Sequence, residues 1–550
     1  MKLNHLLLIL ILFSFELAGA NSINMNYPSY RSSNIQSFRF PGSSNTYFFG
    51  TEWNNGRITY SAVIPESGLY SLQGLVSAPD GGSNSFFLST HGVTRKTIHL
   101  NIIENPTFQN FGSLFLPEGP VEIILDVRES LTKVSDLRLE LNPNTESLDQ
   151  NILGVPETTT ENSACFIDGE KDFLEQRIQS LRVQTSGCNS GVVAPRKEIE
   201  SFRPYEYGTN GTIYNCERVR KKYLYSRPER LYLEELIDQV DHRAESTVNG
   251  SGVQCAVDMY YIWARENAMS KIVGSGEGAR GQSRLDRMWR LGSIAASYLK
   301  SPHIQERAHR QSVGSNNKDT IIKTWINELA TQVRDEAQSL RDDKPDQFGA
   351  NTMIWRGFAL MSSAVLTQDR SLYNMSSSIF MQAMLEIVDD ASRDEDKVFL
   401  PHELSRRSRA LHYHAFALLP LSGLSFISQA YQCDRVSTSW RRSQVARLAR
   451  KTIQGKYDPD VFKREVLAHT GESYNIRTDG TNPNVALLLL DNLRGFESSY
   501  NNITNFVSYQ TGQTVSSYDS QHINLGGELR PLVDRINALK SQNSATLNCN

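Results

Sequence analysis

The sequence predicts a multidomain protein, with an N-terminal all-β sandwich of the jelly-roll type and a C-terminal all-α domain of many antiparallel helices. Three observations support this prediction. Apolar residues alternate with polar ones over short segments from residue 22 to 141. From about residue 229 onward they recur three and four residues apart. The stretch 142–163 is polar and rich in threonine, as expected of a linker.

Short segments in the first part have the alternation of β-strands. Turns rich in glycine, proline, aspartate and asparagine separate them, as at residues 65–68. The segments are residues 58–64, 68–76, 85–89, 97–102, 113–116, 121–127 and 137–141. Seven or more short strands at this spacing are typical of a β-sandwich of roughly 120 residues.

The second part contains segments with helical periodicity, and no strand-like run interrupts them. They are residues 229–247, 253–269, 284–300, 320–341, 354–366, 374–391, 404–431 and 443–453. A helical toroid or solenoid is the natural closure for so many antiparallel helices. We therefore expect a sandwich at 21–141, a linker at 142–163, a helical domain at 164–500 and a loosely structured polar tail at 501–550.

The N-terminus has the features of an export signal. Lys2 gives a positive start, the apolar run extends from Leu6 to Phe15, and small residues follow at 18–20. The run is shorter than the ~20 residues that span a bilayer. We expect cleavage after residue 20 and a mature protein without a membrane anchor. The predicted location is secreted or extracellular, or periplasmic in a Gram-negative host.

The cysteines, the sequons and the net charge fit an exported chain. The six cysteines favour disulfides in an oxidising compartment, and the sequence leaves their pairing open. Acceptor sites for glycosylation begin at Asn210, Asn249, Asn374 and Asn502. The net charge of −3 gives no electrostatic reason to expect a nucleic-acid partner. The sequence has no metal-ligand cluster or nucleotide-binding loop, so we predict no cofactor.

Residues 400–414 are the segment most suggestive of chemistry. A helix starting after Pro401 would place His402, Arg406, Arg409 and Tyr413 on one face. Two adjacent guanidinium groups would favour the phenolate of the tyrosine, whose ordinary pKa is about 10. The alternative is a solvated face whose arginines pair with the acidic residues at 394–396.

This combination of side chains suits β-elimination on a uronate sugar. Donors must neutralise the C6 carboxylate before the C5 proton becomes acidic, a base must remove that proton, and an acid must protonate the departing O4. Arginine and asparagine can do the first. Tyrosine can do the second and third in turn when both groups lie on one side of the ring.

The same segment resembles the signature of the mannuronate-specific alginate lyases, polysaccharide lyase family 5. The matching residues are Leu400-Pro401-His402-Glu403-Leu404, Arg406-Arg407-Ser408-Arg409-Ala410-Leu411-His412-Tyr413-His414, Phe416-Ala417-Leu418-Leu419-Pro420-Leu421, Trp263-Ala264-Arg265 and Arg287-Met288-Trp289-Arg290-Leu291-Gly292-Ser293. The resemblance covers roughly residues 165–460 and implies an (α/α) toroid. It implies that Tyr413 is the catalytic tyrosine and Arg406 the active-site arginine. We assign Arg409, Arg287 and His402 to substrate binding.

A second family motif, Asn-Asn-His-Ser-Tyr-Trp, is only partly kept. The aligned residues are Ala350-Asn351-Thr352-Met353-Ile354-Trp355. The resemblance implies that Asn351 neutralises the substrate carboxylate and that Trp355 stacks on a sugar. The motif histidine is Thr352, and His402, His412 or His414 could replace it or be ordinary helix residues.

Three functions therefore remain open. The chain is an active lyase working without the motif histidine, a lyase for another polyuronate, or a degenerate lyase fold that binds acidic polysaccharide in a matrix or wall. In every case the expected partner is an acidic polysaccharide, either alginate or a related polyuronate.

The N-terminal half resembles carbohydrate-binding module families 6 and 35. The resemblance rests on residues 64–72, 116–123 and 134–141. Sugar sites need exposed aromatic rings, and Trp53 is the only tryptophan in this half, with Tyr47 and Tyr60 nearby. The alternative is that Trp53 is buried and the module is a spacer or a protein-contact domain. We assign no calcium ligands.

Overall fold

A computed structural model describes the fold of this chain. It covers residues 22–141, 158–205, 213–243, 251–390, 398–478, 486, 489 and 521–541, with short gaps at 42, 83, 91–92, 160–161, 168–169, 275–276, 432–435 and 437–438. The chain divides into two compact units. The sandwich unit consists of residues up to 180 and residues 204–224, and the helical unit consists of 181–203 and residues from 225 onward.

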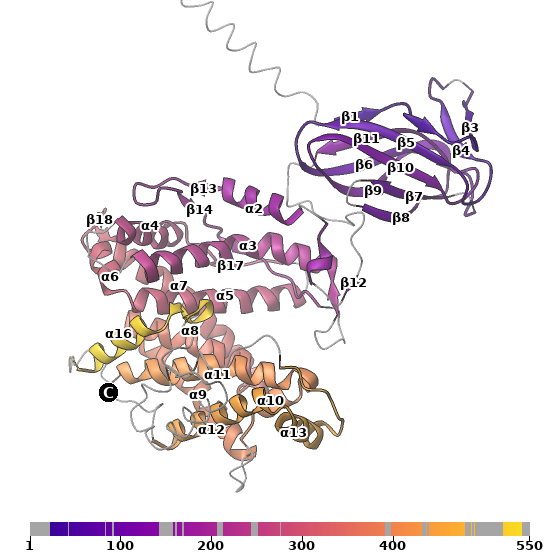
Figure 1. The fold of residues 1–550 in the computed structure, drawn as a ribbon. Coiled ribbons are helices and arrows are strands. Elements are labelled where there is room, and N and C mark those ends of the chain that lie inside the picture. The colour runs from indigo at the N-terminus through magenta and orange to yellow at the C-terminus, as the bar shows by residue number, and fades with distance from the viewer. Residues whose placement is uncertain are drawn as a thin grey trace, which may run out of the picture. The chain divides into compact units, whose positions relative to one another are not determined.

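Two antiparallel sheets form the sandwich (Figure 1). One sheet has the order β3 (Ile35–Phe38), β4 (Tyr47–Gly50), β11 (Lys133–Leu141), β6 (Gly68–Ala78) and β9 (Ile103–Leu116), with β1 (Ser22–Met25) also paired to β11. The other sheet has the order β2 (Tyr30–Arg31), β5 (Arg57–Ile64), β10 (Gly119–Val127), β7 (Ser85–Thr90) and β8 (Val93–His99).

The alternation in the sequence is the cause of this packing. In β5, Ile58, Tyr60 and Ile64 are buried, whereas Ser61 and Val63 are exposed. The buried faces of both sheets contribute to one hydrophobic cluster. The predicted sandwich is confirmed. The early strands escaped prediction because they are short, and because β4 is buried along most of its length and so does not alternate.

The sandwich unit continues beyond its two sheets. Helix α2 (Glu170–Ser180) and the pair β12 (Thr158–Thr159) and β16 (Tyr214–Asn215) belong to it. A disulfide joins Cys165 to Cys216. Nearby, the guanidinium of Arg220 donates to Glu170 at 3.0 Å in a buried ion pair. These links hold the second segment of the unit against the first.

The helical unit is built from long helices whose order follows the chain. They are α3 (Cys216–Asp238, whose first residues lie in the sandwich unit), α4 (Ser251–Arg265), α5 (Glu277–Leu299), α6 (Pro302–His309), α7 (Lys318–Asp343), α8 (Asn351–Thr367), α9 (Arg370–Asp390), α10 (Pro401–Leu404), α11 (Ala410–Ile427), α12 (Ser439–Tyr457), α13 (Asp460–Thr470) and α16 (Arg530–Ser541). Helix α8 is buried along nearly its whole length. It packs against α5, α7, α9 and α11. The predicted fold class, an all-β sandwich followed by an all-α domain, is confirmed.

One segment, Arg407–Ala430, is long and apolar enough to cross a membrane. Most of it is buried inside the helical unit. This is the pattern of a core helix in a globular domain, in which the neighbouring helices cover every apolar side.

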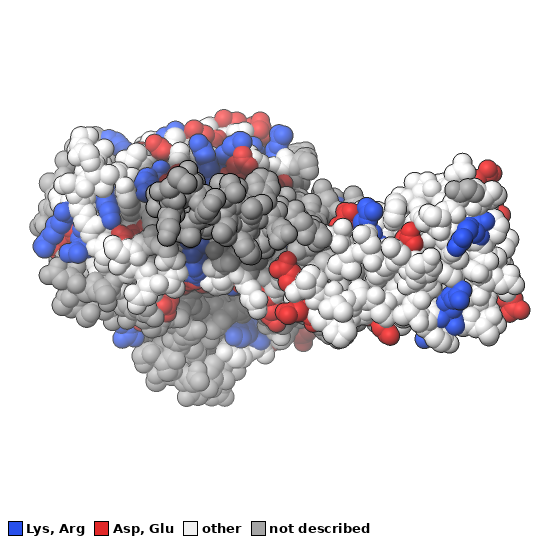
Figure 2. All heavy atoms as spheres, turned by 90° about the horizontal axis from the view of Figure 1, so that it is seen from above, with Lys and Arg blue, Asp and Glu red and all other residues white. Residues whose placement is uncertain are grey.

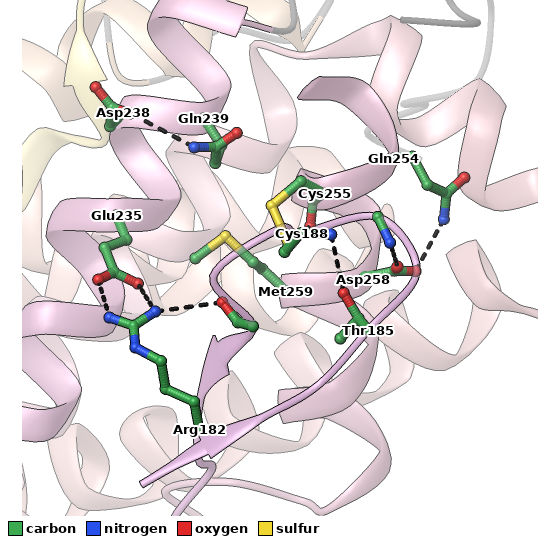
Figure 3. The surroundings of a disulfide bond; sticks show 12 residues. Arg182, Thr185, Cys188, Glu235, Asp238, Gln239, Gln254, Cys255, Asp258 and Met259 are labelled. Atoms are coloured by element: carbon green, nitrogen blue, oxygen red, sulfur yellow. Dashed lines mark hydrogen bonds and ion pairs between the residues drawn. A yellow bond between two sulfur atoms is a disulfide. The ribbon is translucent and has the colours of Figure 1, made fainter. Parts of the chain in front are cut away.

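A second disulfide, Cys188–Cys255, fastens the first segment of the helical unit (Figure 3). That segment carries β13 (Arg182–Val183) and β14 (Val192–Val193). The guanidinium of Arg182 donates to both carboxylate oxygens of Glu235 on α3 and to the Gly191 carbonyl at 3.2 Å. The hairpin is therefore held by a covalent link to α4 and an ion pair to α3.

Several sequence predictions fall outside the described residues. These are the signal peptide at 1–20, the cysteines at 433 and 549, and the sequons that begin at 210, 249 and 502. The sequon at Asn374 lies on α9, where the asparagine is exposed.

The prediction of a loosely structured C-terminal tail is wrong for residues 521–541. Lys300 on α5 donates to the carbonyls of Gly526 and Glu528, at 2.6 and 2.9 Å. Helix α16 buries Leu532, Val533 and Ile536. These residues recur at helical spacing, and the polar composition of the surrounding tail concealed them.

Candidate functional site

The segment 400–414 is not the continuous helix that the sequence predicts. Helix α10 ends at Leu404, a turn and a 3₁₀ segment (Arg407–Arg409) follow, and α11 begins at Ala410. Arg407 adopts a left-handed conformation with φ of 59°. A residue with a side chain pays roughly 1 kcal/mol or more for this conformation. The surrounding structure must therefore stabilise the break.

Two arginines still meet the tyrosine across this break. The guanidinium carbon of Arg406 lies 4.9 Å from the ring centroid of Tyr413, and that of Arg409 lies 5.8 Å from it. Both distances are within cation–π range. Tyr413 is half-buried at the start of α11, and the side chain of Arg406 is 45% exposed. The structure thus brings Arg406, Arg409 and Tyr413 together from a turn and a helix start.

Glu403 connects this group to the start of α8. Its Oε1 accepts the backbone N–H of Asn351 at 2.9 Å, and its Oε2 lies 3.5 Å from Nε of Arg406. Burial raises the pKa of the Glu403 carboxyl, and Arg406 and the amides of Asn351 counteract this in part. Sequence reasoning did not identify Glu403. Its only signal was its place in the motif at 400–404.

His402 lies apart from this group, which corrects the predicted face. Because α10 ends at Leu404, His402 and Tyr413 are not on one helix. The imidazole Nε2 lies 3.7 Å from Oε2 of Glu386 on α9. A hydrogen bond from Glu386 raises the pKa of His402 above its usual range. The Glu386 carboxylate packs against Gly349, where a Cβ would lie only 2.1 Å from it.

The other two histidines of the motif have different environments. His414 is fully buried, its Nε2 accepts the Leu400 N–H at 2.9 Å, and burial lowers its pKa to about 4. It therefore holds the backbone of the segment as a neutral group. The His412 ring lies 5.2 Å from that of Tyr413 and parallel to that of Phe416 at 6.4 Å.

The burial of Trp355 conflicts with its predicted role. Only 1% of the residue is exposed, so its ring offers no face to a sugar. The ring centroid lies 5.1 Å from that of Phe416 and 6.1 Å from that of Phe358. Trp355 therefore supports the aromatic residue that stacks with His412.

A cleft with a volume of about 890 Å³ reaches Thr352, the residue next to Asn351. It lies between α5, α7 and α8, and we call it the arginine cleft after Arg284, Arg287 and Arg356 in its wall. Arg287, predicted to bind substrate, is 3% exposed, and its guanidinium donates to Gln332 and Glu336. The surface in Figure 2 intersperses basic and acidic side chains, so positive charge is gathered locally rather than over a whole face.

Trp53 lies on the sandwich unit, and it is exposed. Its exposed fraction is 58%, which contradicts the alternative that it is buried. It precedes Asn54, which has a φ of 53°, in a tight turn closed by a 2.7 Å hydrogen bond from Asn55 to Glu52. Tyr47 and Tyr60, the other aromatic candidates, are buried in the core.

The described residues contain no cluster of three or more His, Cys, Asp or Glu side chains placed to hold a metal ion. The chemistry available at the Tyr413 site is therefore that of its own hydroxyl, guanidinium, amide and carboxylate groups.

Comparison with known proteins identifies similarity to alginate lyases in the helical unit. Residues 265–462 match the family model described as alginate lyase. The alginate lyase of Pseudomonas syringae pv. syringae is 28% identical over 346 residues, which cover 58% of this chain and 84% of that protein. A polysaccharide lyase of Stenotrophomonas maltophilia (strain K279a) is 29% identical over 222 residues, 40% of this chain and 58% of that one.

Two solved structures are also similar. Alginate lyase A1-III from Sphingomonas species A1 matches with a TM-score of 0.43 and 16% identity, over 68% of this chain and 94% of that one. A family 35 carbohydrate-binding module from Clostridium thermocellum matches with a TM-score of 0.18 and 14% identity, over 22% of this chain and 98% of the module.

Proposed function

We propose that this protein is a polysaccharide lyase that cleaves a uronic-acid polymer, alginate or polymannuronate in the first instance, by β-elimination. The observation that carries the proposal is the cluster in which Arg406 and Arg409 lie over Tyr413. Glu403 joins this cluster to Asn351. The similarity of residues 265–462 to alginate lyases supports the same reaction class. The export signal and the two disulfides suit action outside the cytosol.

In the proposed reaction, Arg406 and Asn351 bind the C6 carboxylate of the uronate and stabilise the charge that develops when C5 loses its proton. Tyr413 takes the C5 proton as the base. The electron pair of the C5–H bond forms the C4=C5 double bond, and the C4–O4 bond breaks. The proton on Tyr413 then passes to O4 of the leaving chain. No water or other reactant is consumed.

Arginines beside the tyrosine favour its phenolate over the neutral phenol, and Glu403 holds Arg406 in place. This is the role of a positioning residue, because Glu403 is buried and acts through Arg406 and Asn351.

Replacing Tyr413 with phenylalanine tests the reaction. Tyr413→Phe should lower kcat by at least about 10²–10⁴-fold, because it removes the base and the acid together. Product is followed by the ultraviolet absorbance of the C4=C5 double bond on polymannuronate, polyguluronate and other polyuronates. Tyr474→Phe is the matched control, since Arg407 lies 5.4 Å from that ring in the same segment.

Retained activity in Tyr413→Phe would refute the assigned chemistry. A second candidate function is supported by Thr352, which leaves the site without the motif imidazole. If the wild-type chain binds the polymers but yields no unsaturated product, the protein is a non-catalytic binder of acidic polysaccharide.

A further inference from the structure

The arginine cleft carries more positive charge than its own carboxylates can balance. Glu336 on α7 pairs with Arg287 and lies 3.5 Å from Nε of Arg284. It also attracts Arg356, without an ion pair. One carboxylate therefore faces three guanidinium groups. The other acidic residue nearby, Asp335, is paired with Arg334 at 2.7 Å.

Arg356 is the residue that this arrangement leaves without compensation. It lies on α8 and is 4% exposed. Its Nη1 donates to the Thr352 carbonyl at 3.2 Å, and its Nε has no hydrogen-bond partner among the described residues. Burial lowers its pKa to about 10, so it remains charged at neutral pH. A buried charge without a partner costs several kcal/mol, which natural folds rarely tolerate without a use.

The place of Arg356 gives the cleft its direction. Thr352 and Arg356 are one turn apart on α8 and both line the cleft, and Thr352 follows Asn351 directly. Four residues of helix rise about 6 Å. The cleft thus begins beside the proposed carboxylate-binding amide and extends away from it toward the three arginines.

Resting on the proposed function, we propose that the arginine cleft is a second anion subsite. There Arg284 and Arg356 bind the carboxylate of another uronate ring of the same polymer chain, away from the bond that is cleaved. Planar guanidinium groups match a carboxylate in geometry. Arg287 is not itself the ligand, because Gln332 and Glu336 already hold it. It keeps Glu336 from neutralising the other two arginines.

Steady-state kinetics on substrates of two lengths test the subsite. Arg284→Gln should raise KM for long polymannuronate about three- to tenfold with kcat little changed, and should leave the shortest cleavable oligosaccharide unaffected. Arg310→Gln is the matched control. Arg310 is an exposed, ion-paired arginine of α6 that does not line the cleft. Arg356→Met should have the larger effect, and Arg284 keeps the test valid if that variant does not fold.

Direct binding separates this inference from the catalytic one. In the Tyr413→Phe background, Kd for long polymannuronate is measured for the Arg284→Gln and Arg310→Gln variants, with and without inorganic phosphate. Weaker binding in Arg284→Gln alone supports the subsite even if the wild-type chain yields no product. Equal Kd values for the two variants would overturn the subsite while leaving the elimination chemistry untouched. Full competition by phosphate alone would show a general anion site, which would overturn the assignment to a uronate.

Discussion

Thr352 stands where related sequences are expected to carry a histidine, beside Asn351 and in the wall of the arginine cleft. If the chain is a weakened lyase, Thr352→His should raise kcat on polymannuronate by up to about 10²-fold, because an imidazole adds a proton carrier and a donor. Thr352→Asn is the control, since it adds a donor that cannot titrate. No gain in either variant, together with binding of polymer by both, would favour the non-catalytic binder.

His402 and Glu386 form a pair whose contribution to stability depends on pH. The hydrogen bond raises the pKa of His402 in the folded protein, so the pair stabilises the fold below the unfolded pKa of about 6.5 and loses this effect as pH rises through the folded pKa. Glu386→Gln should therefore destabilise the protein more at pH 5.5 than at pH 8.5, on the order of 1 kcal/mol. Thermal unfolding at both values measures the difference. An equal loss at both would mean that the imidazole charge is not involved.

Sequence reasoning found Arg406, Arg409 and Tyr413 because their spacing is part of a motif. It could not find the role of Glu403, because that role depends on burial and on a backbone N–H from a helix about 50 residues earlier in the chain. Trp355 failed for the opposite reason. The residue type suits a sugar face, but the packing of α8 against α11 places it inside.

At the scale of elements, the break between α10 and α11 shows tertiary structure overriding local pattern. Residues 402–414 contain no glycine or proline that would signal an interruption. The carbonyl of Ser408, left free by the break, accepts the N–H of Arg477 at 2.8 Å. A contact with a residue so far along the chain is absent from any short sequence window.

Helix α3 carries a buried carboxyl that should weaken the fold. Glu229 is 1% exposed, and neither carboxylate oxygen has a hydrogen-bond partner among the described residues. Burial raises its pKa, so it favours the folded state below the unfolded pKa of about 4.3 and loses that contribution as pH rises. Glu229→Gln should therefore raise the free energy of unfolding by about 1–2 kcal/mol at pH 7.5, and by less near pH 4.5.

Chemical denaturation at the two pH values measures this change. Glu234→Gln on the same helix is the control, since its carboxylate is partly exposed and paired with two arginines. It should shift stability by less than about 1 kcal/mol. A destabilised Glu229→Gln would show that the attraction of Arg290 and Arg196 outweighs burial.

At the scale of the whole molecule, the two units divide the task of holding a polymer. We expect Trp53→Ala, made in the full-length Tyr413→Phe chain so that the polymer stays intact, to weaken retardation in gels containing alginate about tenfold. Tyr27→Ala is the control, because Tyr27 is also exposed on the sandwich unit, at 64%. Equal mobility of the two variants would leave the sandwich without a sugar-binding role at this turn.

The division into an all-β and an all-α part was predictable because periodicity is a property of each segment alone. The pairing of cysteines was not, because it depends on which distant segments meet. The structure pairs Cys165 with Cys216 and Cys188 with Cys255, so each covalent loop encloses one end of the other.

This interleaving bears on how the protein withstands proteases outside the cell. A single cut at any bond between Cys165 and Cys255 separates the partners of at least one disulfide onto different fragments, and that disulfide keeps the fragments joined. Nicking of this region therefore leaves one covalent molecule until a reductant is present. A lost peptide bond here need not release the sandwich from the helices that follow.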